Sequence, residues 1–314
     1  MSLSKNKQMK YIITTFFIVI LILTEGKTQQ LSASTPTWST SNIENPALIH
    51  RSYLKYDLPL SIDLNYRYQW VNIEDSPKTA IGNIQYFNDD NHIAMGATII
   101  NDATNPTSFT GLVINGAYQL VFNKDLYATI GLSGGIYQYR VKGDELNFLE
   151  GEDIASQNIS KFYPDFSIGA SLYIDDFFIG ISLPQTFAID LSFRDANNDF
   201  NIQRVRHYNM ILGGIFSLYN DSWLEPSLNV KYLPNLPVLV DALLKYERNE
   251  IFWLGVGGAT SGKVHLETGF ILQSYGHHSG GLFRLGYGYN YFFNSYGVNF
   301  GSAHEIKLTY SKVN

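Results

Sequence analysis

One stretch of the chain has the residue types of a serine nucleophile. Gly131-Leu132-Ser133-Gly134-Gly135 matches the G-x-S-x-G pattern, in which a serine hydroxyl attacks a carbonyl carbon. That chemistry needs the serine on a sharp turn between a strand and a helix. Here it lies within the alternating run 130–136, which predicts the middle of a strand. We therefore interpret these residues as small residues on a strand face and expect no catalytic role for Ser133.

Histidines offer the other possible chemistry, which is metal binding. His277 and His278 are adjacent in a Gly/Ser-rich stretch, with no third ligand near them in the sequence. The chain has no phosphate-binding G-x-x-x-x-G-K-S/T motif and no G-x-G-x-x-G unit that leads into a helix. The sequence thus predicts a protein that is not an enzyme, with no catalytic residue, no cofactor and no metal site.

Charged side chains recur at alternate positions within apolar runs. In a strand such positions share one face. If the apolar faces meet lipid, eight charged residues point into the lumen of a barrel: Asp63, Arg67, Asp241, Lys245, Glu267, Arg284, Glu305 and Lys307. Both signs are present, so these residues can pair inside the barrel, where an unpaired charge is costly. Two interpretations stay open, namely structural ion pairs that stiffen the wall and polar contacts to a plug or passenger.

The composition narrows the class of protein. The 314 residues include 22 Lys or Arg and 28 Asp or Glu, which gives a net charge of −6. Charged residues make up 16 % of the chain, against about 25 % in typical soluble domains, whereas aromatic residues reach 15 %. The acidic balance argues against a nucleic-acid partner. Because the chain has no cysteine, disulfides and thiolate metal sites are excluded.

The N-terminus has the layout of a secretory signal peptide. Lys5, Lys7 and Lys10 precede the uncharged apolar run 11–23, and a polar stretch follows. The run is shorter than the roughly 20 residues of a membrane-spanning helix, so we expect cleavage near Thr28 and export to the outer membrane. The predicted organisation is a signal peptide at 1–28, an N-terminal periplasmic segment at 29–56 and an outer-membrane β-barrel at 57–314.

Past residue 55 the dominant pattern has a period of two. Ile62 and Leu64 alternate with Asp63 and Asn65, for example, and no comparable segment has a helical period. We predict an all-β protein, a transmembrane antiparallel up-and-down β-barrel of about 14 strands. The predicted strands are 57–71, 78–87, 92–100, 110–122, 126–140, 162–174, 177–183, 205–219, 222–232, 237–247, 251–259, 263–272, 281–291 and 302–312.

The connections between these strands fall into two sets. Short turns rich in Asn and Asp alternate with a set that includes the longest connections, at 101–109, 141–161, 184–204 and 292–301. Outer-membrane barrels have short periplasmic turns and longer outer loops, so we expect the long set outside. A soluble β-sandwich also alternates, but this many strands in one unbroken run would be large for it. Two of the long loops contain Phe148, Phe187, Phe193 and Phe200, a composition typical of binding surfaces or of loops that pack on themselves.

An ordered series of short motifs carries a family resemblance. Asn45-Pro46-Ala47 precedes the first strand, Gln69-Trp70-Val71-Asn72-Ile73-Glu74 leads to Pro77-Lys78-Thr79, and Ser302-Ala303-His304-Glu305-Ile306 closes the series. This series resembles the PorP/SprF family of the type IX secretion system over about residues 38–312. The matching positions are Asn45, Pro46, Gln69, Trp70, Glu74, Pro77, Lys78, Asn101, Asp102, His304 and Glu305. The segment 38–46 departs from the family pattern because it lacks aromatic character.

The resemblance implies an outer-membrane barrel without enzyme activity. Its expected role is in protein secretion and gliding motility, as support for the secretion and surface anchoring of a large adhesin or other cargo. The implied partners are outer-membrane lipid, the secreted adhesin or cargo, and periplasmic ring components of the secretion system. The alternative is a passive outer-membrane pore, because a fourteen-stranded barrel can enclose water.

Overall fold

The computed structural model describes residues 40–49, 58–143, 158–186, 193–194, 199–200, 206–219, 221–248, 251–274, 280–293 and 299–312. Its elements are α2 (Ser41–Glu44), η2 (Pro46–Leu48), β1 (Leu60–Gln69), β2 (Lys78–Asn88), β3 (Ile93–Thr104), β4 (Thr107–Asn123), β5 (Leu126–Val141), β6 (Ile159–Ile174), β7 (Phe177–Leu183), β8 (Phe193–Arg194), β9 (Asp199–Phe200), β10 (Tyr208–Gly214), β11 (Phe216–Leu218), β12 (Ser222–Tyr232), β13 (Leu239–Arg248), β14 (Phe252–Ala259), β15 (Lys263–Ser274), β16 (Gly281–Phe292) and β17 (Ala303–Lys312).

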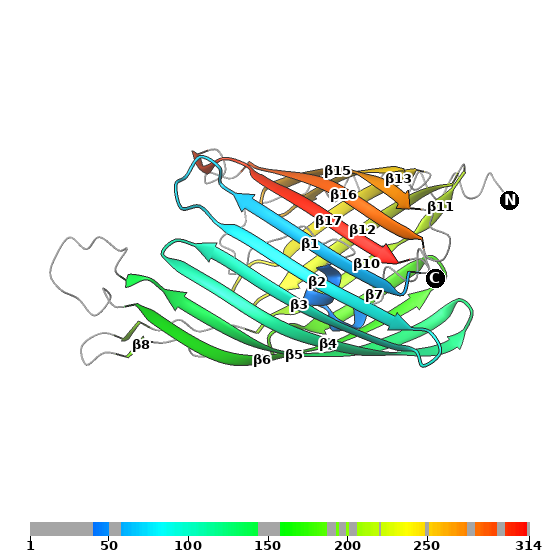
Figure 1. The fold of residues 1–314 in the computed structure, drawn as a ribbon, viewed down its shortest axis with the longest axis horizontal. Helices are drawn as coiled ribbons and strands as arrows, with labels where there is room; N and C mark the ends of the chain where they lie inside the picture. Colours follow the sequence, from blue (N-terminus) through cyan, green and yellow to red (C-terminus); the bar gives the residue numbers. More distant parts are fainter. Residues whose placement is uncertain are drawn as a thin grey trace.

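The strands form one closed antiparallel barrel (Figure 1). Strands of the wall pair with their neighbours along the chain, and β1 pairs with β17. β10 and β11 are separated by Ile215 alone and both pair with β12, so they form one interrupted strand. Counted this way, the described residues build a 14-stranded barrel, and β8 and β9 form a separate hairpin. The predicted up-and-down barrel is therefore confirmed.

The two faces of the wall differ as the alternation predicts. On β1, Asp63 and Arg67 are buried, whereas Ile62 and Leu64 on the opposite face are 39 % and 55 % exposed. Large apolar side chains are exposed in the same way on strand after strand around the barrel. An apolar outer face is the one that hydrocarbon tails cover in a membrane barrel.

The two ends of the barrel differ in their connections (Figure 1). β1 begins and β17 finishes at one end, where the short turn Asp175-Asp176 joins β6 to β7. The connections 142–158 and 184–207 leave from the other end, and the β8–β9 hairpin lies beyond it. The prediction of a long loop at 101–109 was wrong. β3 and β4 keep pairing up to Thr104 and Thr107 because this stretch is rich in strand-forming threonine, so only a tight turn remains.

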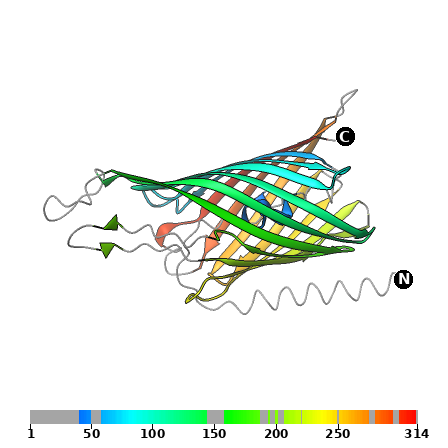
Figure 2. The same cartoon turned by 90° about the horizontal axis from the view of Figure 1, so that it is seen from below.

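Part of the N-terminal segment lies inside the barrel (Figure 2). Residues 40–49, called the plug from here on, form α2 and η2, and most of their side chains are buried against the inner wall. This differs from the predicted periplasmic location of 29–56. The rest of that segment and the predicted signal peptide lie outside the described residues. No helix in the described ranges is long and apolar enough to cross a membrane.

Three apolar clusters lie inside the barrel near the end that has the short turns, and two of them include a residue of the plug. Leu48 packs with Tyr173, Phe178 and Ile211; Ile49 packs with Phe87, Ala94 and Ala117; and Leu58 packs with Trp253, Ile271 and Leu282. We call these three clusters the apolar floor. Their members are almost fully buried, and they occupy the lumen side of the wall toward this end of the barrel.

Candidate functional site

The plug rests on lumen-facing glycines of neighbouring strands. A Cβ on Gly131 would lie 2.3 Å from the carbonyl carbon of Pro46, and one on Gly169 would lie 1.9 Å from Oδ1 of Asn45. Glycine is needed here because any larger residue would occupy the space of the plug. Four such positions, on β3, β5, β6 and β7, form what we call the glycine seat: Gly96, Gly131, Gly169 and Gly180.

Asn45 ties the plug to two strands of the wall. Its Nδ2 donates hydrogen bonds to the carbonyl oxygens of Ala170 on β6 (3.3 Å) and Ile181 on β7 (3.2 Å). Its Oδ1 accepts a hydrogen bond from the backbone N–H of Ala47 (2.9 Å) and so caps η2. Because Asn45 is buried, each of these polar groups needs its partner. The motif residues Asn45 and Pro46 thus lie together in the glycine seat.

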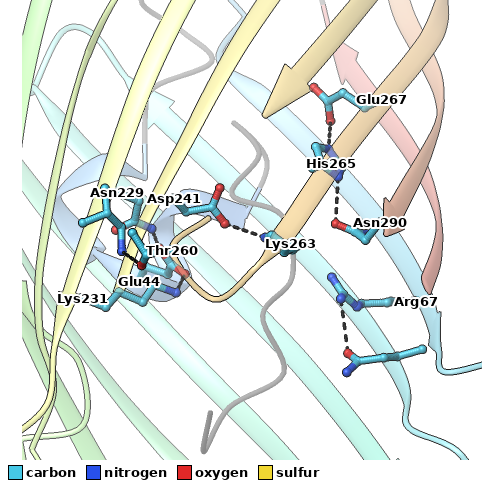
Figure 3. Close-up of polar contacts among 12 residues, drawn as sticks. Glu44, Arg67, Asn229, Lys231, Asp241, Thr260, Lys263, His265, Glu267 and Asn290 are labelled. Atoms are coloured by element: carbon cyan, nitrogen blue, oxygen red, sulfur yellow. Dashed lines mark hydrogen bonds and ion pairs between the residues drawn. The ribbon is translucent and has the colours of Figure 1, made fainter. Parts of the chain in front are cut away.

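The other end of the plug contacts β12 and β2. The Glu44 carboxylate accepts a hydrogen bond from Asn229 and forms an ion pair with Lys231, both on β12 (Figure 3). The side chains of Glu44 and Lys231 remain 23 % and 22 % exposed. Asn42 donates from Nδ2 to Oδ1 of Asn83 on β2 (3.2 Å). The plug therefore connects strands far apart in the sequence.

A buried ionic network lies on the wall made by β1, β15, β16 and β17. Nζ of Lys307 is 3.0 Å from Oε2 of Glu267 and 3.8 Å from Oε1 of Glu305. His265 lies between Glu267 and Asn290, with its Nε2 3.4 Å from Oε2 of Glu267 and its Nδ1 2.9 Å from Oδ1 of Asn290 (Figure 3). The ionic network consists of Asn65, His265, Glu267, Asn290, Glu305 and Lys307. Its charges tolerate burial because they are paired.

Two more ion pairs lie beside this network. Nη2 of Arg284 on β16 is 3.0 Å from Oε2 of Glu247 on β13. Nζ of Lys263 on β15 is 2.5 Å from Oδ2 of Asp241 on β13 (Figure 3). These pairs link β13 to β15 and β16 across the strands between them, so they add bonds that the backbone ladder does not make.

Through its ring, Trp253 contacts two cations, Lys245 and Arg284. Its ring is 5.5 Å from Nζ of Lys245 and 5.7 Å from Cζ of Arg284, distances at which a cation is attracted to the ring face. A Cβ on Gly269 would lie 2.2 Å from the Trp253 ring, and one on Gly286 would lie 2.7 Å from it. Inward glycines on this wall therefore make room for side chains from neighbouring strands.

The eight charged residues expected in the lumen all lie on the inner face of the wall. Glu267, Glu305 and Lys307 come together in the ionic network. Asp241 and Arg284 instead pair with residues that the sequence interpretation left out. The eight are Asp63, Arg67, Asp241, Lys245, Glu267, Arg284, Glu305 and Lys307, and each is buried or largely buried.

Sequence reasoning missed several lumen residues that contribute to the same contacts. They are Glu44, Lys231, Glu247, Lys263, His265 and Asn290. The signal for some of them was present: Glu247 follows Lys245 by two positions, and Lys263, His265 and Glu267 follow one another at steps of two. Glu44 had no such signal because it does not belong to a strand.

Most of the remaining motif residues, Trp70 among them, lie at the end of the barrel with the long connections. Trp70 has a φ of 58°, its N–H donates to the carbonyl oxygen of Ser302 (2.9 Å), and its ring packs edge-on against Phe300 at 5.5 Å. These contacts join the start and the finish of the barrel wall, because Trp70 follows β1 and Ser302 precedes β17. The motif residues at this end are Gln69, Trp70, Glu74, Pro77, Lys78, Asn101, Asp102 and His304.

Polar contacts hold several members of this group. Asp102 accepts a hydrogen bond from Oγ1 of Thr79 (2.9 Å), and Gln69 accepts one from Arg67 (3.2 Å). His304 lies within hydrogen-bond distance of the Tyr287 hydroxyl. The motif therefore divides into plug residues, residues at this end of the barrel, and Glu305 in the ionic network.

The structure describes only one of the two places where the sequence offered residues for chemistry, which are Ser133 and the pair His277 and His278. Ser133 lies in the middle of β5, faces the lumen and is 8 % exposed, without the strand-to-helix turn of a nucleophile elbow. His277 and His278 lie outside the described residues. Among the residues that are described, no group of three or more His, Cys, Asp or Glu side chains is placed to hold a metal ion.

The sequence profile of one protein family covers nearly the whole barrel and the plug. It is described as "Type IX secretion system membrane protein PorP/SprF" and matches residues 33–310. The chain belongs to this family. The PorP/SprF membership and the fold together make it an outer-membrane barrel of the type IX secretion system. No curated protein sequence matches the chain.

Solved structures of other barrels share the fold at low sequence identity. The "CymD monoaromatic hydrocarbon channel" is 10 % identical with a TM-score of 0.50, over 90 % of this chain and 94 % of that one. The "TodX deltaS2S3 mutant monoaromatic hydrocarbon channel" is 9 % identical with a TM-score of 0.50, over 87 % and 94 %. At these identities the likeness extends to the fold alone.

Proposed function

We propose that this PorP/SprF protein binds a secreted adhesin or other type IX cargo at the end of the barrel with the long connections. In this role it supports secretion and surface anchoring of the cargo, and it catalyses no reaction. The observation that carries the proposal is the occupied lumen: the plug and the apolar floor lie inside the barrel, toward the end that has the short turns. A barrel filled in this way suits a binding scaffold better than an open conduit.

The proposed binding surface is supported by the unequal ends of the barrel. Outer-membrane barrels place short turns in the periplasm and longer loops outside, and recognition commonly resides in loops that a rigid scaffold positions. The connections after β5 and β7 leave from the end of the barrel with the long connections, and the connection after β7 contains the β8–β9 hairpin. Phe148 and Phe187 lie outside the described residues, whereas Phe193 and Phe200 pair in that hairpin.

The orientation is tested first, by labelling single cysteines in this cysteine-free chain. An impermeant thiol reagent added to whole cells is expected to label a cysteine at position 150 but not one at position 124. The reverse pattern would place the short turns outside and contradict the proposed binding surface.

The binding role is tested by shortening residues 184–204 to a tight turn. The barrel should still fold and insert, because its wall makes its hydrogen bonds without this connection. We expect the cargo to be lost from the cell surface, measured by proteomics of the surface and the medium. A matched variant that shortens 142–158, the connection between β5 and β6, indicates which connection carries the contact. Normal delivery of every type IX cargo by both variants would contradict the proposal.

A passive pore makes a different prediction in planar bilayers. With the plug seated, we expect the purified protein to carry no large steady current, because the plug and the apolar floor occupy part of the lumen. A large steady current from the unmodified protein would favour the pore instead.

A further inference from the structure

The barrel wall has one region of short strands. β7 and β10 each have seven residues and β11 has three, whereas β4 has 17 and β5 and β6 have 16 each. We call the strands β7, β10, β11 and β12 the seam. Short strands share fewer backbone hydrogen bonds with their neighbours, so the wall is held together less strongly here.

The ladder of the seam is also interrupted. Ile215 separates β10 from β11, and its N–H donates to the carbonyl oxygen of Asp176 in a turn (2.8 Å). On β12, pairing with β10 ends at Ser227 and pairing with β11 begins at Leu224. Pro226 lies within this gap and has no N–H to donate. The seam thus combines short strands with a break in their pairing.

The plug spans this seam from inside the lumen. On one side, Asn45 donates to Ile181 of β7, and Oγ of Ser182 on β7 donates to the carbonyl oxygen of Glu44 (2.7 Å). On the other side, the carboxylate of the same Glu44 is bound by Asn229 and Lys231 of β12. β10 lies between β7 and β12, so the plug bridges both of its neighbours.

The base of the plug contacts β10 itself. Leu48 packs in one buried cluster with Phe178 of β7 and Ile211 of β10, and both wall residues are less than 8 % exposed. The plug therefore touches all three strands on which the continuity of the seam depends.

We propose that the plug is a latch that holds the seam of the barrel closed, so that unseating residues 40–49 opens the wall between β7 and β12. The seat is built for reversible contact: glycines receive the plug, and its bond to β12 is an ion pair that water still reaches. The wall formed by β15, β16 and β17 needs no such latch, because these strands pair without a break along 10 or 12 residues and carry the ionic network. This inference does not depend on the proposed cargo role.

The latch is tested by hydrogen exchange with mass spectrometry on the full mature protein in lipid vesicles. Gly169→Ala places a methyl group on Asn45, and Glu44→Gln removes the charge that Lys231 binds. Gly169→Ala should speed amide exchange at 177–183 and 208–218 by about tenfold or more, because local opening of the seam exposes these amides. Glu44→Gln should speed it by about two- to fivefold, because an ion pair that water reaches contributes little. Exchange at 281–292 should stay unchanged. Gly116→Ala is the control, since a Cβ there meets nothing within 4 Å.

Three outcomes would overturn the latch. One is faster exchange in all strands alike, which indicates general loss of stability. Another is retained protection at 208–218 after residues 40–49 have lost theirs. The third is unchanged exchange in both stretches. If Gly169→Ala does not fold, Glu44→Gln together with Lys231→Met gives the same readout without added bulk.

Discussion

The plug and the ionic network fill different parts of one lumen by different means. In both regions inward glycines create the space. On β5 and β6, Gly131 and Gly169 admit a separate segment of chain, whereas on β14 Gly255 admits the Glu267 side chain of the adjacent strand. A side chain that belongs to the wall cannot leave without breaking the wall. A segment that belongs to no strand can leave the lumen, and only the seam that it bridges is then expected to open.

The two regions also differ in how far water reaches their charges. Glu267 and Lys307 have side chains that are 4 % and 10 % exposed, whereas Glu44 and Lys231 are 23 % and 22 % exposed. Losing one partner of a buried pair leaves an uncompensated charge, but exposed partners are rehydrated. We infer that the ionic network sets the stability of the barrel and that the plug contributes a contact that can be reversed.

The largest expected effect comes from Lys307→Met. This change leaves Glu267 and Glu305 without their shared cation, and breaking a buried pair in this way costs about 3–5 kcal/mol. The matched change beside the plug, Lys231→Met, should cost less than about 1 kcal/mol. Urea unfolding of protein refolded in lipid vesicles measures both free energies. Equal costs would remove the difference between the two regions.

Arginine substitutions on the outer face should destabilise the protein by similar amounts all around the barrel. Three exposed leucines are on the outer face of the wall. Leu120 is on β4, next to the strands of the glycine seat, and Leu285 and Leu308 are on β16 and β17, whose inner faces carry the ionic network. Arginine at each should cost about 2–4 kcal/mol near the membrane midplane. Arginine at the inward neighbours Gln119 and Thr309 should cost far less. If the outward substitutions differ by region, then the difference between the regions is not confined to the lumen.

The strands could be predicted from the sequence because their signal is local. Alternation along β1 or β16 is visible in one strand at a time, and it also places Asp63 and Arg284 on the inner face. The ladder extensions at Thr104 and Thr107 were missed because pairing of two strands, and not the pattern of either, decides where a turn begins.

The plug could not be predicted in the same way. Asn42 and Asn45 lie in a polar stretch that resembles a linker, and their partners Asn83 and Ile181 are far away in the sequence. The glycines of the seat appear in the sequence only as residues that weaken a strand. Only the closed barrel brings a linker-like segment and these glycines together.

Replacing an inward glycine of the ionic network with alanine should have a destabilising effect of intermediate size. A Cβ on Gly255 would lie 2.5 Å from Cγ of Glu267, so Gly255→Ala pushes a paired side chain into a filled space. Overpacking of this kind costs about 1–3 kcal/mol. Gly116→Ala, which adds a methyl group in open space, is the control and should leave the urea midpoint nearly unchanged. A Gly255→Ala barrel as stable as the control would mean that the ionic network shifts as readily as the plug.

The smallest expected effect is the change with salt of two coupling energies, that of Glu44 with Lys231 and that of Glu267 with Lys307. A double-mutant cycle on Glu44→Gln and Lys231→Met should give a coupling energy of about 0.2–1 kcal/mol. Counter-ions reach this pair, so the coupling should weaken clearly between about 0.05 M and about 0.5 M salt. The same cycle on Glu267→Gln and Lys307→Met should give a larger coupling that salt does not change, because both side chains are at most 10 % exposed. If salt weakens both couplings equally, then the ionic network is as open to water as the plug, and the inference that one region is permanent and the other reversible would be wrong.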